Sequence, residues 1–107
     1  MNDIDYAIDQ FVTKCRELVQ ADGRKELGYD LVRGGGRKYI KIIMLTSNQQ
    51  SSWCFVNYEN GDIYKCGGWK APDPRKIPRG NVYDPYDGMR NINWTGPAYA
   101  SHLRDTT

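Results

Sequence analysis

Residues 51–66 read SSWCFVNYENGDIYKC, and this stretch decides the fold. Residues 51–58 alternate between side chains suited to the two faces of a sheet, and residues 62–66 form a second β-prone run. Asn60-Gly61 lies between the two runs. An Asn-Gly pair in that position is the strongest short-range signal for a hairpin with a type I′ turn. The stretch therefore predicts two antiparallel strands joined by a tight turn.

Two further strands are predicted upstream of the hairpin. Residues 39–46 read YIKIIMLT, and the apolar run within them indicates a central, well-buried strand. Residues 29–33 form a shorter strand candidate, and Gly34-Gly35-Gly36 between the two can adopt the positive φ angles of a turn. Together with the hairpin, these segments predict an antiparallel β-meander over residues 28–66.

The N-terminal segment predicts an amphipathic helix over residues 3–22. Asp3 suits the N-cap position, and Asp22-Gly23 is typical of a helix C-terminus. We therefore expect an α+β fold, in which this helix packs on a small antiparallel sheet of three to five strands. The apolar residues that recur at steps of three and four, and so share one helix face, are Ile4, Ala7, Ile8, Phe11, Val12, Cys15, Leu18 and Val19.

The composition changes after the meander. Residues 67–81 read GGWKAPDPRKIPRGN, and three prolines within seven residues exclude a helix interior or a central strand. Residues 82–107 form a turn-rich tail. We expect a single domain over residues 1–107, in which residues 67–81 form a long Pro/Gly-rich binding loop.

Composition and charge narrow the class of protein. Residues 23–82 carry eleven Lys and Arg against five Asp and Glu, whereas residues 1–22 carry two against five. A basic, aromatic-rich middle suits a phosphate-bearing ligand, although the solvated face of a sheet would give the same totals. No apolar stretch is long enough for a membrane span or a leader, so we expect no membrane partner. Three cysteines without a CxxC pair predict free thiols in a reducing cytoplasm.

No pattern of catalytic or metal-binding residues stands out, and we expect neither catalysis nor a cofactor. His102 is the only histidine and lies in the polar tail, which argues against a catalytic triad and against a zinc site. The chain contains no GxSxG, GxxxxGK[ST] or HExxH pattern. Asp84 and Asp87 lie in a turn-rich segment, where carboxylates usually serve turns. Cys66 has no base beside it in the sequence.

The loop contains the side chains that a nucleotide site needs. Trp69 offers a ring on which a base can stack, and Lys70 and Arg79 can hold phosphates. Asn81 can bond a sugar or a base edge. A structural alternative stays open, in which Trp69 folds onto the sheet and Arg79 pairs with a carboxylate. The expected ligand-binding residues are Trp69, Lys70, Arg79 and Asn81, with Lys65 and Trp53 as secondary candidates.

Ordered blocks of the sequence resemble a family of small, mostly hypothetical phage-encoded proteins. The similarity extends over residues 37–99 and follows that family's pattern of FV, GD(V/I)YK, WKxP and RGN. The resemblance implies an origin, namely a phage accessory protein that acts in the cytoplasm of a bacterial host. The matching blocks are Ser52–Val56, Asn60–Lys65, Gly68–Pro72 and Arg79–Asn81.

The expected function is sequestration, without catalysis, of a nucleotide-derived host immune signal, such as an ADP-ribose derivative or a cyclic nucleotide. The link to host defence is an analogy with other small phage proteins, and we expect a homo-oligomer. One alternative is single-stranded nucleic-acid binding. It would need the basic strand residues to join the loop cations on one face; they are Arg33, Arg37, Lys38 and Lys41. The other is a protein inhibitor of a host defence enzyme, with the acidic helix residues as its contact surface; they are Asp3, Asp5 and Asp9.

Overall fold

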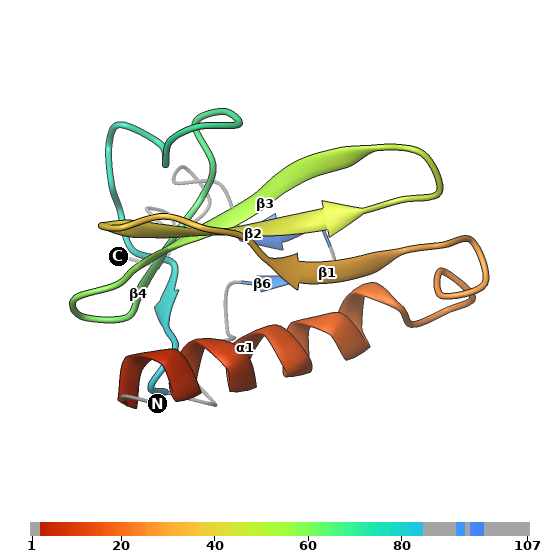
Figure 1. The fold of residues 1–107 in the computed structure, drawn as a ribbon, viewed down its shortest axis with the longest axis horizontal. Helices are drawn as coiled ribbons and strands as arrows, with labels where there is room; N and C mark the ends of the chain where they lie inside the picture. The colour runs from red at the N-terminus through yellow and green to blue at the C-terminus, as the bar shows by residue number, and fades with distance from the viewer. Residues whose placement is uncertain (1–2, 85–91, 94, 98–107) are drawn as a thin grey trace, which may run out of the picture.

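A computed structural model describes residues 3–84, 92–93 and 95–97. One helix packs on a five-stranded antiparallel sheet, which confirms the predicted α+β fold (Figure 1). The sheet follows chain order, and its first four strands form the predicted meander. A separate two-stranded sheet joins β6 (Ile92–Asn93) to β7 (Gly96–Pro97). The other elements are α1 (Asp3–Val19), β1 (Asp30–Arg33), β2 (Tyr39–Leu45), β3 (Gln50–Asn57), β4 (Asp62–Tyr64) and β5 (Gly80–Asn81).

Helix α1 buries the predicted apolar face except for Leu18, which is half-buried, and the helix ends at Val19, before the predicted residue 22. The side chain of Arg24 folds back and donates hydrogen bonds to the carbonyl oxygens of Leu18 and Val19, at 2.9 and 2.8 Å. Basic side chains can satisfy the last carbonyls of a helix in this way. Asp22 and Gly23 then adopt φ angles of 57° and 84°, so the predicted stop signal forms the turn after the helix.

The apolar core lies between α1 and one face of the sheet. Along β2, Ile40, Ile42 and Met44 are buried, whereas the residues between them are half-buried. Directly opposed residues of neighbouring strands point to the same side, so Cys54 and Val56 of β3 share this face. The alternation of β2 therefore separates a helix-facing set of side chains from a set that faces away.

A β-bulge in β3 adds Trp53 to this core. The pairing of β2 with β3 shifts between Ile42 and Ile43, which leaves Trp53 as the extra residue. Trp53 is 4 % exposed and belongs to the helix-side core. Phe55, two residues further on, faces the opposite side with its cross-strand partner Lys41. The uniform alternation predicted for β3 is therefore interrupted at Trp53.

The connection between β3 and β4 has four residues, 58–61, and the predicted two-residue type I′ turn is wrong. Gly61 has a φ of 84°, but Asn60 does not have the positive φ that a type I′ turn requires. Instead, the Oδ1 atom of Asn57 accepts hydrogen bonds from the N–H groups of Glu59 and Asn60, at 2.8 and 3.4 Å. This local side-chain contact favours the longer turn.

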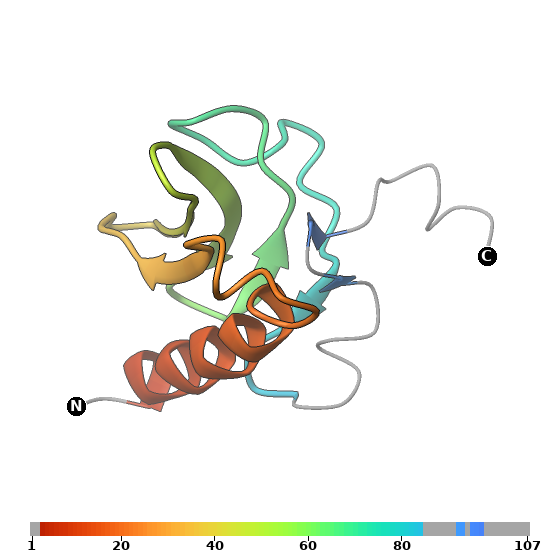
Figure 2. The same cartoon turned by 90° about the vertical axis from the view of Figure 1, so that its right-hand side faces the viewer.

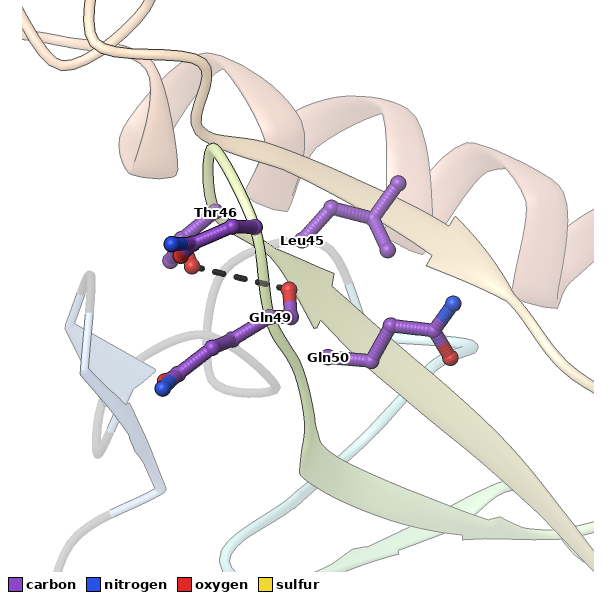
Figure 3. A pocket seen from close by; sticks show the side chains of 5 residues that line it. Leu45, Thr46, Gln49 and Gln50 are labelled. Carbon is purple, nitrogen blue, oxygen red and sulfur yellow. Dashed lines mark hydrogen bonds between the residues drawn. The ribbon is translucent and has the colours of Figure 1, made fainter.

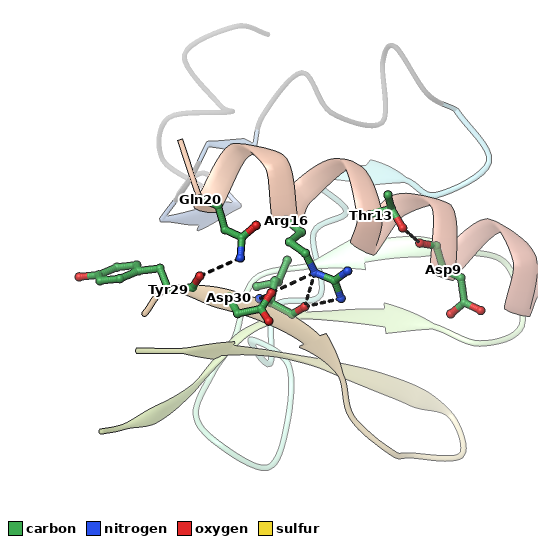
Figure 4. A network of polar contacts seen from close by, with 7 residues as sticks. Asp9, Thr13, Arg16, Gln20, Tyr29 and Asp30 are labelled. Atoms are coloured by element: carbon green, nitrogen blue, oxygen red, sulfur yellow. Dashed lines mark hydrogen bonds and ion pairs between the residues drawn. The ribbon is translucent and has the colours of Figure 1, made fainter. Parts of the chain in front are cut away.

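Polar side chains of α1 cover the outer edge of β1 (Figure 4). Arg16 donates two hydrogen bonds, of 3.2 and 3.1 Å, to the carbonyl oxygen of Leu31, and it pairs with Asp30 at 3.0 Å. Gln20 donates to the carbonyl oxygen of Tyr29 at 3.0 Å. An open strand edge can pair with another chain. These contacts occupy edge carbonyls that would otherwise be available for such pairing.

Arg33 ties the first half of α1 to the sheet. Its guanidinium pairs with Asp5 at 2.6 Å and with Asp9 at 3.2 Å. The hydroxyl of Tyr58 donates to the other carboxylate oxygen of Asp5 at 2.8 Å. The hydrogen bonds from Arg33 and Tyr58 lower the pKa of Asp5. Asp5 and Asp9, considered above as a contact surface, are thus engaged within the fold.

The remaining expectations concern the membrane, the thiols and the tail. Among the described residues, no helix has the length and apolar character needed to cross a bilayer. All three cysteines are free, as the sequence predicts. Of the predicted tail, only residues 82–84, 92–93 and 95–97 are described, so the expectations for Asp87 and His102 fall on residues outside that part of the chain.

Candidate functional site

The sheet face that α1 leaves uncovered carries aromatic and basic side chains. Tyr39 and Lys41 point to this face, because they alternate along β2 with the buried core residues. Phe55 and Tyr64 lie on the same face and are only 2 % and 7 % exposed. Residues 66–79 arch over this side of the sheet, opposite α1 (Figure 1, Figure 2). We name the surface above the sheet the aromatic–basic face; it consists of Lys38, Tyr39, Lys41, Trp69 and Lys76.

Hydrogen bonds fasten the loop to the strands beneath it. The N–H of Asp73 donates to the carbonyl oxygen of Lys65 at 2.8 Å. On the other side of the loop, the hydroxyl of Ser52 donates to the carbonyl oxygen of Gly68 at 2.9 Å. Trp69 follows Gly68 directly, so this second contact fixes the backbone from which the indole ring extends.

The rings and the ammonium groups of the aromatic–basic face lie against one another. The Nζ atom of Lys41 is 3.7 Å from the centre of the Trp69 ring. The Nζ atoms of Lys76 and Lys38 are 5.3 and 5.6 Å from the centre of the Tyr39 ring. These distances are within the range of cation–π attraction. Trp69 is 44 % exposed as a residue, so it lies at the surface of the loop.

The floor of this face is formed by a second tyrosine. The rings of Tyr39 and Tyr64 meet edge to face, with centres 5.9 Å apart and planes at 82°. Edge-to-face contact is a favoured geometry for aromatic pairs. Burial, followed by the charge of Asp62, raises the pKa of Tyr64, so its hydroxyl stays protonated at neutral pH. Tyr64 therefore supports Tyr39 without adding charge.

An ion pair within the loop neutralises the carboxylate of Asp73. The Nη2 atom of Arg75 is 2.6 Å from Oδ2 of Asp73, and its Nε atom is 3.1 Å from Oδ1. These hydrogen bonds lower the pKa of Asp73 well below its usual range. Because this bidentate contact occupies both carboxylate oxygens, Asp73 contributes little negative charge to the face.

Arg79, which the sequence suggests as a phosphate contact, is buried. It is 1 % exposed, and its Nη1 atom donates to the carbonyl oxygen of Ile77. Burial lowers the pKa of Arg79, while the charge of Asp73 acts in the opposite direction. Its backbone N–H donates to the carbonyl oxygen of Ile63 at 2.8 Å, where the loop joins the sheet edge. In this arrangement Arg79 supports the loop from below and is not at the surface.

The other expected site residues are dispersed. Asn81 donates to the carbonyl oxygen of Asn60 at 2.9 Å and to Asp62 at 3.0 Å, so its amide stabilises the β3–β4 turn. Lys65 donates to the carbonyl oxygen of Pro97 at 3.4 Å. Trp53 lies in the core, as described above. Lys70 is exposed beside Trp69 on the loop, so these two are the expected residues that the structure places together at the surface.

A comparison with models of protein families identifies the family of this chain. The model of a family of unknown function, DUF7717, matches residues 4–100. The chain belongs to the DUF7717 family. A search of the curated proteins and a search of the solved structures each gave no match.

In this DUF7717 protein, four residues of the aromatic–basic face were not among the expected site residues. They are Tyr39, Lys41, Lys38 and Lys76. A signal for the first two exists in the sequence, because they alternate with Ile40 and Ile42 and must therefore face away from the core. No comparable signal places Lys76, since its position depends on how the loop folds back over β2.

Elsewhere in the DUF7717 chain, a cavity of about 250 Å³ lies at the β2–β3 turn (Figure 3). Leu45, Thr46 and three amide side chains line it, so it offers no titratable group for catalysis. Within the described residues, no three His, Cys, Asp or Glu side chains gather as metal ligands would. Burial raises the pKa of the Cys66 thiol, which is therefore protonated at neutral pH and a weak nucleophile.

Proposed function

We propose that this protein binds a phosphate-bearing nucleotide on the aromatic–basic face and holds it without chemical change. The observation that carries the proposal is the ammonium of Lys41, 3.7 Å from the centre of the partly exposed Trp69 ring. A nucleotide presents the complementary pair of groups, a flat base and an anion. The base can stack on the indole, and the phosphate can take the ammonium as its counterion.

The charge of the surroundings supports an anionic ligand. Three lysines lie on this face, and the carboxylate of Asp73 is bound by Arg75. Lys70 lies beside Trp69 and can add to the same field. Arg79 and Asn81, which are engaged within the fold, have supporting roles in this proposal. The proposal assigns the contacts with the ligand to Lys41 and to the exposed lysines of the aromatic–basic face.

The biological role that we propose is sequestration of a nucleotide-derived immune signal by a phage accessory protein in the cytoplasm of a bacterial host. This part rests on the sequence resemblance described above and on the analogy with other small phage proteins. An ADP-ribose derivative or a cyclic nucleotide would meet the requirements of the site. Such a protein needs affinity alone, which suits a surface that has stacking and ionic groups.

Isothermal titration with ADP-ribose and a cyclic dinucleotide tests the proposal. The variant Trp69→Ala should weaken binding by roughly five- to 150-fold, which is the range that corresponds to loss of one base–aromatic stack. Lys14→Gln, on the exposed side of α1, removes one charge from the other layer and should leave affinity unchanged. Equal affinity of wild type and Trp69→Ala would remove the basis for this site.

Native mass spectrometry complements the titration. The protein is purified from cells that produce nucleotide immune signals, and a co-purifying mass would identify the ligand. The same spectrum reports whether a monomer or a homo-oligomer holds it. Absence of any bound nucleotide, together with no heat in the titrations, would refute sequestration.

Single-stranded nucleic acid is a second candidate, favoured by the position of Lys38 and Lys41 on one face with Lys76. Arg33 does not join them, since it pairs with Asp5 and Asp9 on the helix side. A strand binder would prefer a decanucleotide over a mononucleotide and would lose affinity steeply as salt increases. A small ligand that binds as well as the decanucleotide would exclude this candidate.

A further inference from the structure

The surroundings of Tyr39 form a second cationic position on the aromatic–basic face. Lys38 and Lys76 approach the Tyr39 ring from separate parts of the chain, with their Nζ atoms 5.6 and 5.3 Å from its centre. Both side chains are exposed, so neither ammonium is committed to the core. Lys41 and Trp69 form the first position, two residues further along β2.

We propose that Lys38 and Lys76 form a second anion subsite, so that the ligand is a nucleotide with two phosphate groups. The inference rests on the proposed nucleotide site and specifies its ligand class. Tyr39 and Lys41 lie on the same face of one strand, roughly 6.6 Å apart along it. The ammonium of Lys41 lies against the Trp69 ring and those of Lys38 and Lys76 lie against the Tyr39 ring, so a ligand with two phosphates can engage both positions.

The backbone of Lys76 is an independent observation that supports this subsite. Its φ is 51°, in the left-handed region, where residues with a side chain are uncommon. Glycine or asparagine adopts this conformation more easily. Residues held in such regions are concentrated at functional sites, where the surrounding structure maintains the strain. Here the conformation directs a long cationic side chain over Tyr39.

The carboxylate nearest in sequence to Lys76, that of Asp73, is paired within the loop. Asp73 accepts a hydrogen bond from the backbone N–H of Lys76 through its carbonyl oxygen, at 2.9 Å, while its carboxylate binds Arg75. Two ammonium groups on an aromatic ring, with the carboxylate of Asp73 paired to Arg75, are suited to a second phosphate.

Two classes of nucleotide carry two phosphate groups. In ADP and ADP-ribose the two are joined as a pyrophosphate, and in a cyclic dinucleotide they are separate phosphodiesters. The experiment therefore compares four ligands, AMP, ADP, ADP-ribose and cyclic di-AMP, by isothermal titration at fixed salt. We expect AMP to bind at least about tenfold more weakly than the best two-phosphate ligand, since a charge-assisted contact contributes about that factor or more.

The double variant Lys38→Gln/Lys76→Gln is the matched test. It should lower the affinity for the two-phosphate ligands to that for AMP and leave the affinity for AMP unchanged. Lys14→Gln, on the other layer, should change neither. The relative affinity of ADP-ribose and cyclic di-AMP then shows whether the phosphates are joined or separate.

The titrations distinguish refutation of the second anion subsite from refutation of the nucleotide site itself. If AMP and the two-phosphate ligands bind equally tightly, and the double variant binds them as well as wild type does, the second subsite is refuted and the proposed nucleotide site stands. If none of the four ligands binds, both are refuted. Binding that is confined to oligonucleotides of several residues also refutes the two-phosphate ligand.

Discussion

Replacement of Lys76 by glycine tests whether its left-handed backbone is strained. An L-residue in this conformation costs about 1–2 kcal/mol, and glycine removes that cost. The substitution also loses the contact with Tyr39, for which roughly 0.5 kcal/mol is expected at an exposed site. Glycine further loses about 0.5–1 kcal/mol through the greater freedom of the unfolded chain.

Lys70→Gly is the control that isolates the strain. Lys70 lies on the same loop, is exposed, and does not have a positive φ. Its replacement by glycine therefore incurs the entropic loss and relieves no backbone strain. The entropic contributions of the two variants cancel in their difference. We therefore expect the unfolding free energy of Lys76→Gly to exceed that of Lys70→Gly by about 1 kcal/mol, or about 4 °C in Tm.

Urea unfolding followed by circular dichroism measures this difference. Unchanged m-values would show that the variants differ in stability and not in the extent of unfolding. Lys76→Gly should nevertheless bind two-phosphate nucleotides more weakly, because it lacks one ammonium of the proposed subsite. If Lys76→Gly is no more stable than Lys70→Gly, the left-handed conformation carries no cost and the argument from strain is wrong.

Three further predictions concern the fold. Gly36→Ala should lower the unfolding free energy by about 1–3 kcal/mol, because the added Cβ would lie 2.0 Å from a carbonyl oxygen of β2; Gly35→Ala, with open space, is the control in the same urea titration. The pKa of Asp5 is lower in the folded state than its ordinary value of 3.8, so its ion pair contributes stability above about pH 4 that is lost as pH falls. Thermal unfolding from pH 7 to pH 2 should show this loss, and Asp5→Asn should reduce it; equal pH dependence in both proteins would contradict the assignment. Arg16→Ala should open the edge of β1 and cause the protein to associate at high concentration. Light scattering measures this association. If the variant stays in the wild-type oligomeric state, the edge is protected by other contacts.

The fold followed from local patterns in the sequence. The apolar face of α1 and the alternation of β2 each depend on residues a few positions apart, so period and burial could be read directly. The predicted end of α1 and the predicted turn before β4 were wrong because a polar side chain bonds the backbone at each place. Arg24 satisfies the last carbonyls of α1, and Asn57 lengthens the turn before β4. Neither contact is visible in hydrophobic periodicity.

The geometry of the candidate site could be anticipated only in part, for a different reason. Trp69 and Lys70 could be identified because the loop sequence itself concentrates aromatic and basic residues. The contact of Lys41 with Trp69 joins residues far apart in the chain, and it exists only after the loop folds over β2. The burial of Arg79 likewise depends on the packing of the loop and not on its composition. The cations nearest in sequence to Trp69 are therefore not all among those nearest to it in space.

The loop divides its basic residues between two roles, and this division explains how so small a surface can retain charge. Arg75 and Arg79 interact with Asp73, Ile77 and the sheet edge, so the guanidinium groups maintain the shape of the loop. The lysines are left for the surface. Arginine suits the first role because its planar fork makes several directed hydrogen bonds, whereas the compact ammonium of lysine can follow an anion. Exchange of the two types would thus alter the shape of the loop in Arg79→Lys and the proposed ligand contact in Lys76→Arg.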